Sequence, residues 1–215
     1  MQTDKITITS KGSGMEEAME EAMKFAEYIG LDRKKTMRLR LLVEETLGMV
    51  EAITDDFAAY FWLESDEDKS YRIHLTAETY MDYNKKQGLL SITRDGKNDA
   101  SRGFMGKIRN LIENSIYNMN EVGRLQAEYG GSPVMYGSMG MYDVDASSSL
   151  STYAYMWSMD NYRQSIQDQM EEDKASKDAW DELEKSIVAS IADDVRVGVK
   201  GNIVEMVIEK KNYGG

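Results

Sequence analysis

The apolar positions along the chain are spaced most regularly in residues 32–54. There they recur at steps of three and four residues, the spacing that aligns side chains on one face of an α-helix: Leu39, Val43, Leu47, Val50 and Ile53. Asp32 precedes this stripe and belongs to the residue types that cap the first turn of a helix. The pattern therefore predicts an amphipathic helix over residues 32–54, with one face on a core.

A second stripe of the same helix, beside the core-facing one, carries a carboxylate. Leu42, Glu45, Met49 and Ala52 are also three or four residues apart, so Glu45 and Met49 lie one turn from each other. A glutamate in this place is either a solvated charge at the rim of the core or part of a functional site. The spacing alone leaves both interpretations open.

The remaining strands are predicted from period-two alternation or from runs rich in aromatic or β-branched residues, and the remaining helices from helical spacing. Strands are predicted at residues 5–10, 59–64, 71–79, 88–93, 195–200 and 203–210. Helices are predicted at residues 15–29, 105–119, 150–174 and 179–192. Gly201 and Asn202 indicate a β-hairpin turn between the last two strands, and the Gly- and Ser-rich stretch 128–149 around Pro133 indicates a long loop.

This order of elements predicts the fold class. Strands that neighbour each other in sequence, with helices before and after them, are typical of an α+β two-layer sandwich with the helices on one face of the sheet. We expect a single domain over residues 1–215, interrupted by a large, mainly helical insertion at about residues 98–179.

Composition and charge narrow the function classes. The chain carries 38 Asp and Glu residues against 26 Lys and Arg, a formal charge of −12, which repels nucleic acids and acidic membranes. It has no cysteine, which excludes disulfides and thiolate metal sites, and a single histidine, His74, which excludes a multi-histidine zinc site. His74 stands at an alternating position of a predicted strand, where a sheet-face histidine is expected rather than a catalyst. With no leader pattern and no long apolar run, we expect a soluble, cytoplasmic protein.

The helical stretch LRLLVEETLGMVEAIT, with GLDRKKTMR before it and strands after it, resembles the ATP-binding domain of anti-sigma regulatory factors. Those domains belong to the superfamily of histidine kinase-like (GHKL-type) ATPases. The resemblance covers about residues 3–97 and 180–211. It implies a two-layer α/β sandwich with a mixed sheet and helices on one face.

The resemblance also assigns roles to positions of this sequence. Glu45 matches a glutamate that can act as general base in such domains, and Met49 stands where they have a magnesium-binding asparagine. A thioether is a soft, weak acceptor and cannot replace an amide oxygen as a ligand for Mg²⁺. The family has a second motif, Asp-x-Gly-x-Gly, whose Asp recognises the adenine amino group. Asp95 and Gly96 are its candidates here, adjacent where the family has one residue between them, and an ordinary turn is the alternative interpretation.

Two functions follow from the resemblance. The first is a regulatory or interaction protein on an anti-sigma-factor-like ATPase fold, with ATP binding weakened or lost, no cofactor and, on balance, no enzymatic activity. Its expected partner is another protein, such as a sigma factor or an antagonist-like regulator, and a homodimer is left open. The second is an ATP-binding protein or serine kinase whose magnesium is held by Glu44, Glu45 or Asp95. A third possibility is an unrelated α+β domain.

Overall fold

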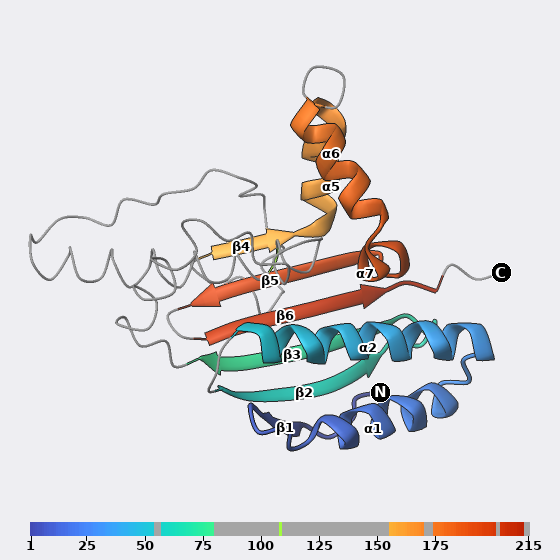
Figure 1. The fold of residues 1–215 in the computed structure, drawn as a ribbon. Coiled ribbons are helices and arrows are strands. Elements are labelled where there is room, and N and C mark those ends of the chain that lie inside the picture. The colour runs from blue at the N-terminus through green and yellow to red at the C-terminus, as the bar shows by residue number, and fades with distance from the viewer. Residues whose placement is uncertain (54–56, 80–107, 109–154, 170–173, 201–202, 213–215) are drawn as a thin grey trace, which may run out of the picture.

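The computed structural model describes residues 1–53, 57–79, 108, 155–169, 174–200 and 203–212. In these residues the protein forms a six-stranded sheet and five helices (Figure 1). Several predicted elements lie outside the described residues: the strand at 88–93, the loop at 128–149, the turn at Gly201-Asn202 and, apart from Ile108, the helix at 105–119.

The sheet has the strand order β1-β2-β3-β6-β5-β4. Its strands are β1 (Ile6–Thr9), β2 (Phe57–Ser65), β3 (Tyr71–Thr79), β4 (Tyr155–Ser158), β5 (Asp194–Lys200) and β6 (Ile203–Lys210). All pairings between these strands are antiparallel, so the mixed sheet implied by the resemblance is wrong for the described strands. The connection from β1 to β2 gives the reason for one of these pairings. A single crossover helix would bring the chain back for a parallel strand, but two helices lie between β1 and β2. The second helix reverses the chain again, so β2 runs antiparallel to β1.

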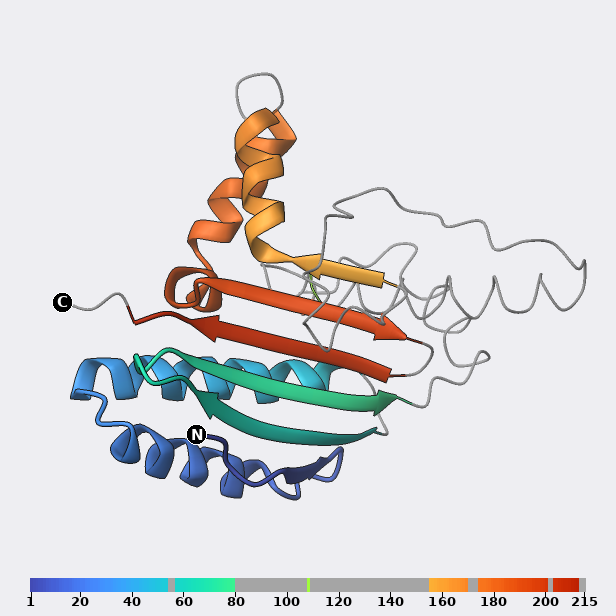
Figure 2. The same cartoon turned by 180° about the vertical axis from the view of Figure 1, so that it is seen from behind.

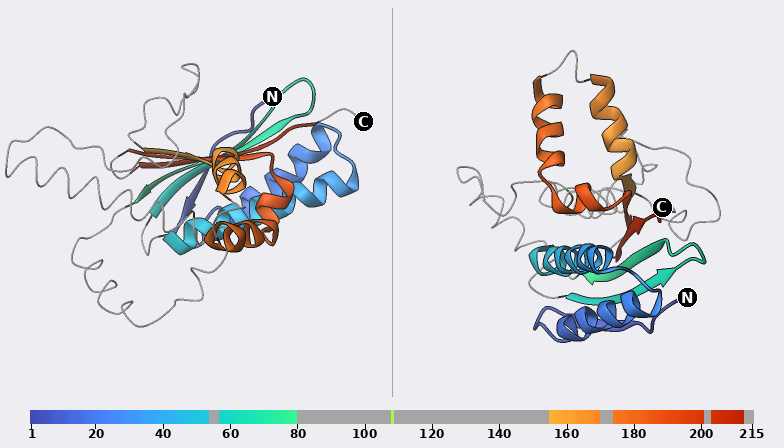
Figure 3. Two further views of the ribbon diagram at one scale, coloured as in Figure 1. Left: turned by 90° about the horizontal axis from the view of Figure 1, so that it is seen from above. Right: turned by 90° about the vertical axis from the view of Figure 1, so that its right-hand side faces the viewer.

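Three of the described helices, α1 (Met15–Tyr28), α2 (Arg33–Ile53) and α7 (Ile187–Ile191), lie on one face of the sheet (Figures 1 and 3). Seen from behind, the strands β2, β3 and β6 lie in front of α2 (Figure 2). The helices α5 (Met159–Gln169) and α6 (Lys174–Glu184) extend past the β4 edge. The α+β class is therefore confirmed. No helix in the described part of the chain is long and apolar enough to cross a lipid bilayer.

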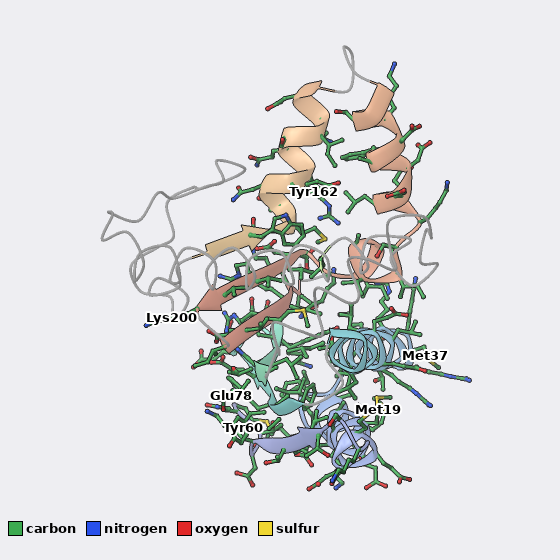
Figure 4. All side chains as sticks on the ribbon, turned by 60° about the vertical axis from the view of Figure 1, so that its left-hand side comes forward. Met19, Met37, Tyr60, Glu78, Tyr162 and Lys200 are labelled. Atoms are coloured by element: carbon green, nitrogen blue, oxygen red, sulfur yellow. The ribbon has the colours of Figure 1, made fainter. Side chains whose placement is uncertain are left out.

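Alternate side chains of each strand enter the core between the sheet and the helices. On β2, Phe61 is fully buried, whereas its neighbour Tyr60 is 50% exposed. Figure 4 shows Tyr60 and Glu78 on the side of the sheet away from Met19 and Met37, which lie on α1 and α2. Both layers supply the largest fully buried side chains, among them Phe25, Leu39, Leu42, Phe61, Leu63 and Ile73.

The helix predicted at residues 32–54 is confirmed as α2. Asp32 caps its first turn, since the Asp32 Oδ1 atom accepts the backbone N–H of Lys35 at 2.9 Å. This hydrogen bond lowers the pKa of the Asp32 carboxyl below its ordinary value, because it favours the charged form. The predicted core positions Leu39, Val43 and Leu47 are buried.

The prediction of a helix at residues 150–174 is wrong for residues 155–158, the first of this segment that the structure describes. Tyr155–Ser158 form the strand β4, which pairs antiparallel with β5, and α5 starts only at Met159. An edge strand presents unpaired backbone N–H and C=O groups. Because Tyr155 and Trp157 are of types that suit a strand, pairing with β5 overrides the helical spacing of this segment.

The helix predicted at residues 179–192 is divided between α6 and α7. Ser186 lies between them with φ −77° and ψ 129°, an extended conformation. Its Oγ atom accepts the backbone N–H of Ala189 at 3.3 Å and so caps α7. This cap lets one helix end and the next begin in a new direction without leaving that N–H group unpaired.

Candidate functional site

Glu45, the candidate general base, lies at the rim of the core on α2. It is half-buried beside Leu42 and Thr46, which are fully buried, and the Thr46 hydroxyl donates to the Leu42 carbonyl at 2.6 Å. Glu45 makes no hydrogen bond or ion pair with any residue that the structure describes. Among the described residues, this environment is that of a carboxylate at the edge of the core, with no bonded neighbour that would activate it.

Of the positions that the resemblance assigns to a magnesium nucleotide, one carries a residue type unsuited to the metal. Met49 lies one turn further along α2, in a part of the helix whose side chains fall outside the described set. Its sulfur is of the wrong chemical class for Mg²⁺, which requires hard oxygen ligands. Asp95 and Gly96, the candidates for reading adenine, lie outside the described residues and stay a prediction. Within the described ranges no group of three or more His, Asp and Glu side chains is placed to hold a metal ion.

The face of the sheet away from α1 and α2 carries an aromatic and cationic stack. The rings of Trp62 on β2 and His74 on β3 are parallel within 5°, with their centroids 4.7 Å apart. The two residues are direct partners in the β2–β3 register. The Lys5 ammonium lies 4.5 Å from the centroid of the Trp62 ring, within reach of a cation–π interaction. These residues come from three segments of the chain, and the strand register brings them together.

His74 is held in its neutral form by its surroundings. Its Nε2 atom lies 3.1 Å from Glu64 Oε2, and since a carboxylate can only accept, this nitrogen carries the hydrogen. Its Nδ1 atom is buried and has no hydrogen-bond partner among the described residues. Burial lowers the pKa of His74 below its ordinary value, and the negative charge of Glu64 offsets this only in part. A second ring proton would have to sit on the Nδ1 atom, where no acceptor meets it.

Next to His74 and Glu64, a row of ion pairs between charged side chains runs across the same face of the sheet. Arg72 donates to both carboxylate oxygens of Asp66, at 3.3 and 2.7 Å, and lies 3.7 Å from Glu64 and 3.9 Å from Glu209. Arg196 approaches the same Glu209 at 3.6 Å. Partly exposed ion pairs of this kind stabilise a protein by about 0–1 kcal/mol each. Their main effect here is to hold the guanidinium and imidazole groups in fixed positions on one face.

Sequence reasoning placed His74 on a sheet face, as found, but missed the stack and the ion-pair row. The signal that could have found them is the period-two placement of Trp62 and Glu64 on one strand and Arg72 and His74 on the next. The missing piece was the register between the two strands, because a slip of one residue would send these side chains to the opposite face.

The lowered pKa of His74 predicts how stability depends on pH. Unfolded chains take up the histidine proton near the ordinary value of 6.5, and the folded protein does so only at lower pH. The unfolded state then binds more protons, so the free energy of unfolding falls as the pH drops below about 6.5. We expect a smaller fall between about pH 7.5 and 5.5 in His74→Phe, which keeps a stacking ring without a titrating group.

Urea denaturation of both proteins at several pH values measures this difference. Since the chain has one histidine, NMR of its ring protons gives the pKa of His74 directly. A midpoint at or above about 6.5 would contradict the environment described for this ring.

The described residues thus place Glu45 at the edge of the core on α2 and a fixed stack of aromatic and charged groups on the opposite side of the sheet. Neither set contains a nucleophile next to a base, the arrangement that covalent catalysis needs. Searches of protein-family models, of curated protein sequences and of solved structures find no match to this chain.

Proposed function

We propose that the chain is a regulatory protein that acts by binding another protein, on an anti-sigma-factor-like ATPase fold with ATP binding weakened or lost. The observation that carries this proposal is the pair of positions on α2. Glu45 and Met49 are one turn apart in a regular helix, and the resemblance gives the Met49 thioether the position of the magnesium ligand. The scaffold for a nucleotide site is kept in this proposal, and the metal ligand is lost.

The order of the described elements supports the proposal. A strand, two helices and two strands open the chain, and a helix followed by a β-hairpin closes it. This is the order that the resemblance implies for residues 3–97 and 180–211, as far as the described residues cover them. The position of α1, α2 and α7 on one face of the sheet is also what the resemblance implies (Figure 3).

The other face of the sheet offers features suited to a protein partner. Tyr60 is 50% exposed there, two residues along β2 from Trp62, whose ring stacks on His74. Arg72 lies further along the same face, opposite Glu64 in the β2–β3 register. Tyrosine, tryptophan and arginine are enriched among the residues that dominate protein–protein binding. Because the rings and the guanidinium are already fixed in place, a partner would lose little free energy in ordering them.

A thermal-shift titration with Mg-ATP and Mg-ADP tests the loss of nucleotide binding. A ligand that binds the folded state raises its stability by about 2.7 kcal/mol at one hundred times its Kd, which is a rise in Tm of roughly 5–11 °C for a chain of this size. We expect no such rise at millimolar nucleotide.

The variant Met49→Asn provides the gain-of-function arm of this experiment, because it restores the amide oxygen. Met37→Asn is the matched control: the same substitution on the same helix, at a methionine that is 52% exposed. A rise in Tm with Met49→Asn and not with Met37→Asn would support the proposal. A rise with the unchanged protein that inorganic phosphate at the same concentration does not reproduce would contradict it and favour the ATP-binding protein or serine kinase.

A further inference from the structure

A small pocket lies at the end of the sheet where α2 begins. It has a volume of about 40 Å³ and is lined mainly by cationic side chains, together with one tyrosine: Lys35, Arg38, Lys69, Lys210, Lys211 and Tyr71. These residues come from α2, from the turn before β3, and from the start of β3 and the end of β6. Tyr71 and Lys210 are direct partners in the β3–β6 register, so the sheet itself brings them together.

The positive charge in this pocket is only partly neutralised. Asp193 binds the Lys210 ammonium at 3.1 Å and accepts the Lys211 backbone N–H at 2.6 Å. Lys35 donates to the side chain of Asn212 at 2.9 Å, which is a neutral partner. Arg38 has no hydrogen bond or ion pair with any described residue. A chain with a net charge of −12 thus concentrates cations at one point, and of the described carboxylates Asp193 forms an ion pair with them.

The two other carboxylates near the pocket are held by different groups. Asp32 accepts the backbone N–H of Lys35, and Asp68 accepts the backbone N–H of Ser70 at 2.8 Å and its hydroxyl at 2.9 Å. The lysine ammonium groups use part of their donors: Lys35 donates to Asn212, Lys210 to Asp193, and Lys69 to the Gly30 carbonyl at 3.5 Å. An ammonium group has three N–H donors, so each of these lysines keeps at least one for an anion from solution.

The hydroxyl of Tyr71 is the second observation that points to a ligand. Tyr71 is only 4% exposed and lines the pocket, yet its hydroxyl has no hydrogen-bond partner among the described residues. Burial raises the pKa of Tyr71, so the group stays protonated and can donate. The hydroxyl oxygen is not among the fully buried unpaired atoms of the described residues, so it is accessible from the pocket and can donate to an acceptor placed there.

We infer that this pocket binds a small anion with a phosphate group, either inorganic phosphate or a phosphate monoester. A buried water needs about 10–15 Å³ of such space, so the pocket holds a group of roughly three water volumes, the size of one phosphate. A phosphate dianion can accept from an arginine, from lysines and from a hydroxyl at once, which matches the donors present. Arg38 would supply a pair of parallel N–H donors, and Tyr71 the hydroxyl.

The pocket is separate from the positions considered for nucleotide chemistry. Glu45 is seven residues beyond Arg38 on α2, which is about 10 Å along the helix axis. The inference therefore stands apart from the proposed regulatory function. A rise in Tm with nucleotide that disappears in Arg38→Gln would report this pocket, and one that persists would report a different site.

Isothermal titration calorimetry of the full chain with inorganic phosphate, at constant ionic strength set with chloride, tests the inference. Arg38→Gln should weaken phosphate binding by about tenfold, since it removes a charge-assisted contact. Arg40→Gln is the matched control: the same change of charge, two residues away on the same helix, at an exposed arginine that does not line the pocket. Tyr71→Phe should weaken binding by about fivefold.

Three results would overturn the inference: no phosphate binding by the unchanged protein, equal weakening by Arg38→Gln and Arg40→Gln, or acetate binding as tight as phosphate. A titration with glycerol 3-phosphate shows whether the pocket prefers a phosphate monoester or inorganic phosphate. Binding tighter than that of inorganic phosphate identifies a monoester, and weaker binding identifies free phosphate; both results support a phosphate site.

Discussion

Phe61→Ala will lower the free energy of unfolding by about 3–5 kcal/mol, because it removes a fully buried ring and leaves a cavity. Phe61 pairs with Ile6 on β1 and with Leu75 on β3, and both are buried as well. The helices α1 and α2 cover this face of the sheet, so little solvent can enter to fill the space. Urea denaturation measures the loss, and an unchanged m-value would show that the unfolded state is not altered.

Tyr60→Ala is the matched control for this prediction. Tyr60 is the preceding residue of β2 and is 50% exposed, with Thr7 and Thr76 as its cross-strand partners. Loss of such cross-strand contacts costs about 0.2–1 kcal/mol. Equal destabilisation by the two variants would mean that the helices do not cover the Phe61 face. If Phe61→Ala does not fold, Phe61→Leu tests the same position with a smaller cavity.

Gly14→Ala will destabilise the protein by about 3 kcal/mol or more, by an effect of backbone geometry. Gly14 precedes α1 with φ +84°, and a Cβ atom there would lie 2.1 Å from the carbonyl oxygen of Thr7. Thr7 belongs to β1, so relief of this clash requires a shift of the strand or of the helix. The left-handed backbone itself adds roughly 1–2 kcal/mol for a residue with a side chain.

Gly12→Ala separates the two contributions. Gly12 has nearly the same backbone conformation, with φ +80°, but a Cβ atom there meets nothing within 4 Å. We expect this variant to lose only the roughly 1–2 kcal/mol of the left-handed conformation. Similar values for both variants in urea denaturation would show that β1 and α1 move apart at little cost.

The candidate site was predictable only in part. Glu45 and Met49 could be placed on one helix face from the sequence, because their relation is local and follows from helical periodicity. The pocket beside Tyr71 could not, because Lys35, Lys69 and Lys210 are far apart in the chain and meet only through the β3–β6 pairing. The same is true of the stack between Trp62 and His74, which depends on strand register.

The sequence by itself determined the elements whose cause is local. Helices α1 and α2 follow from apolar stripes, the strands β2 and β3 from alternation, and the closing strands β5 and β6 from two apolar runs on either side of a turn signal. In each of these segments the spacing of side chains and the residue types agree, so the local preference and the final fold coincide.

Only the tertiary structure decided β4, the break between α6 and α7, and the pairing of β3 with β6. Tyr155–Ser158 have helical spacing, but the open edge of β5 offers backbone hydrogen bonds that a helix at this place would leave unmade. Ser186 can cap a helix or lie within one, and the change of direction that brings α7 against α2 selects the cap. Such choices depend on groups distant in sequence, which local periodicity does not record.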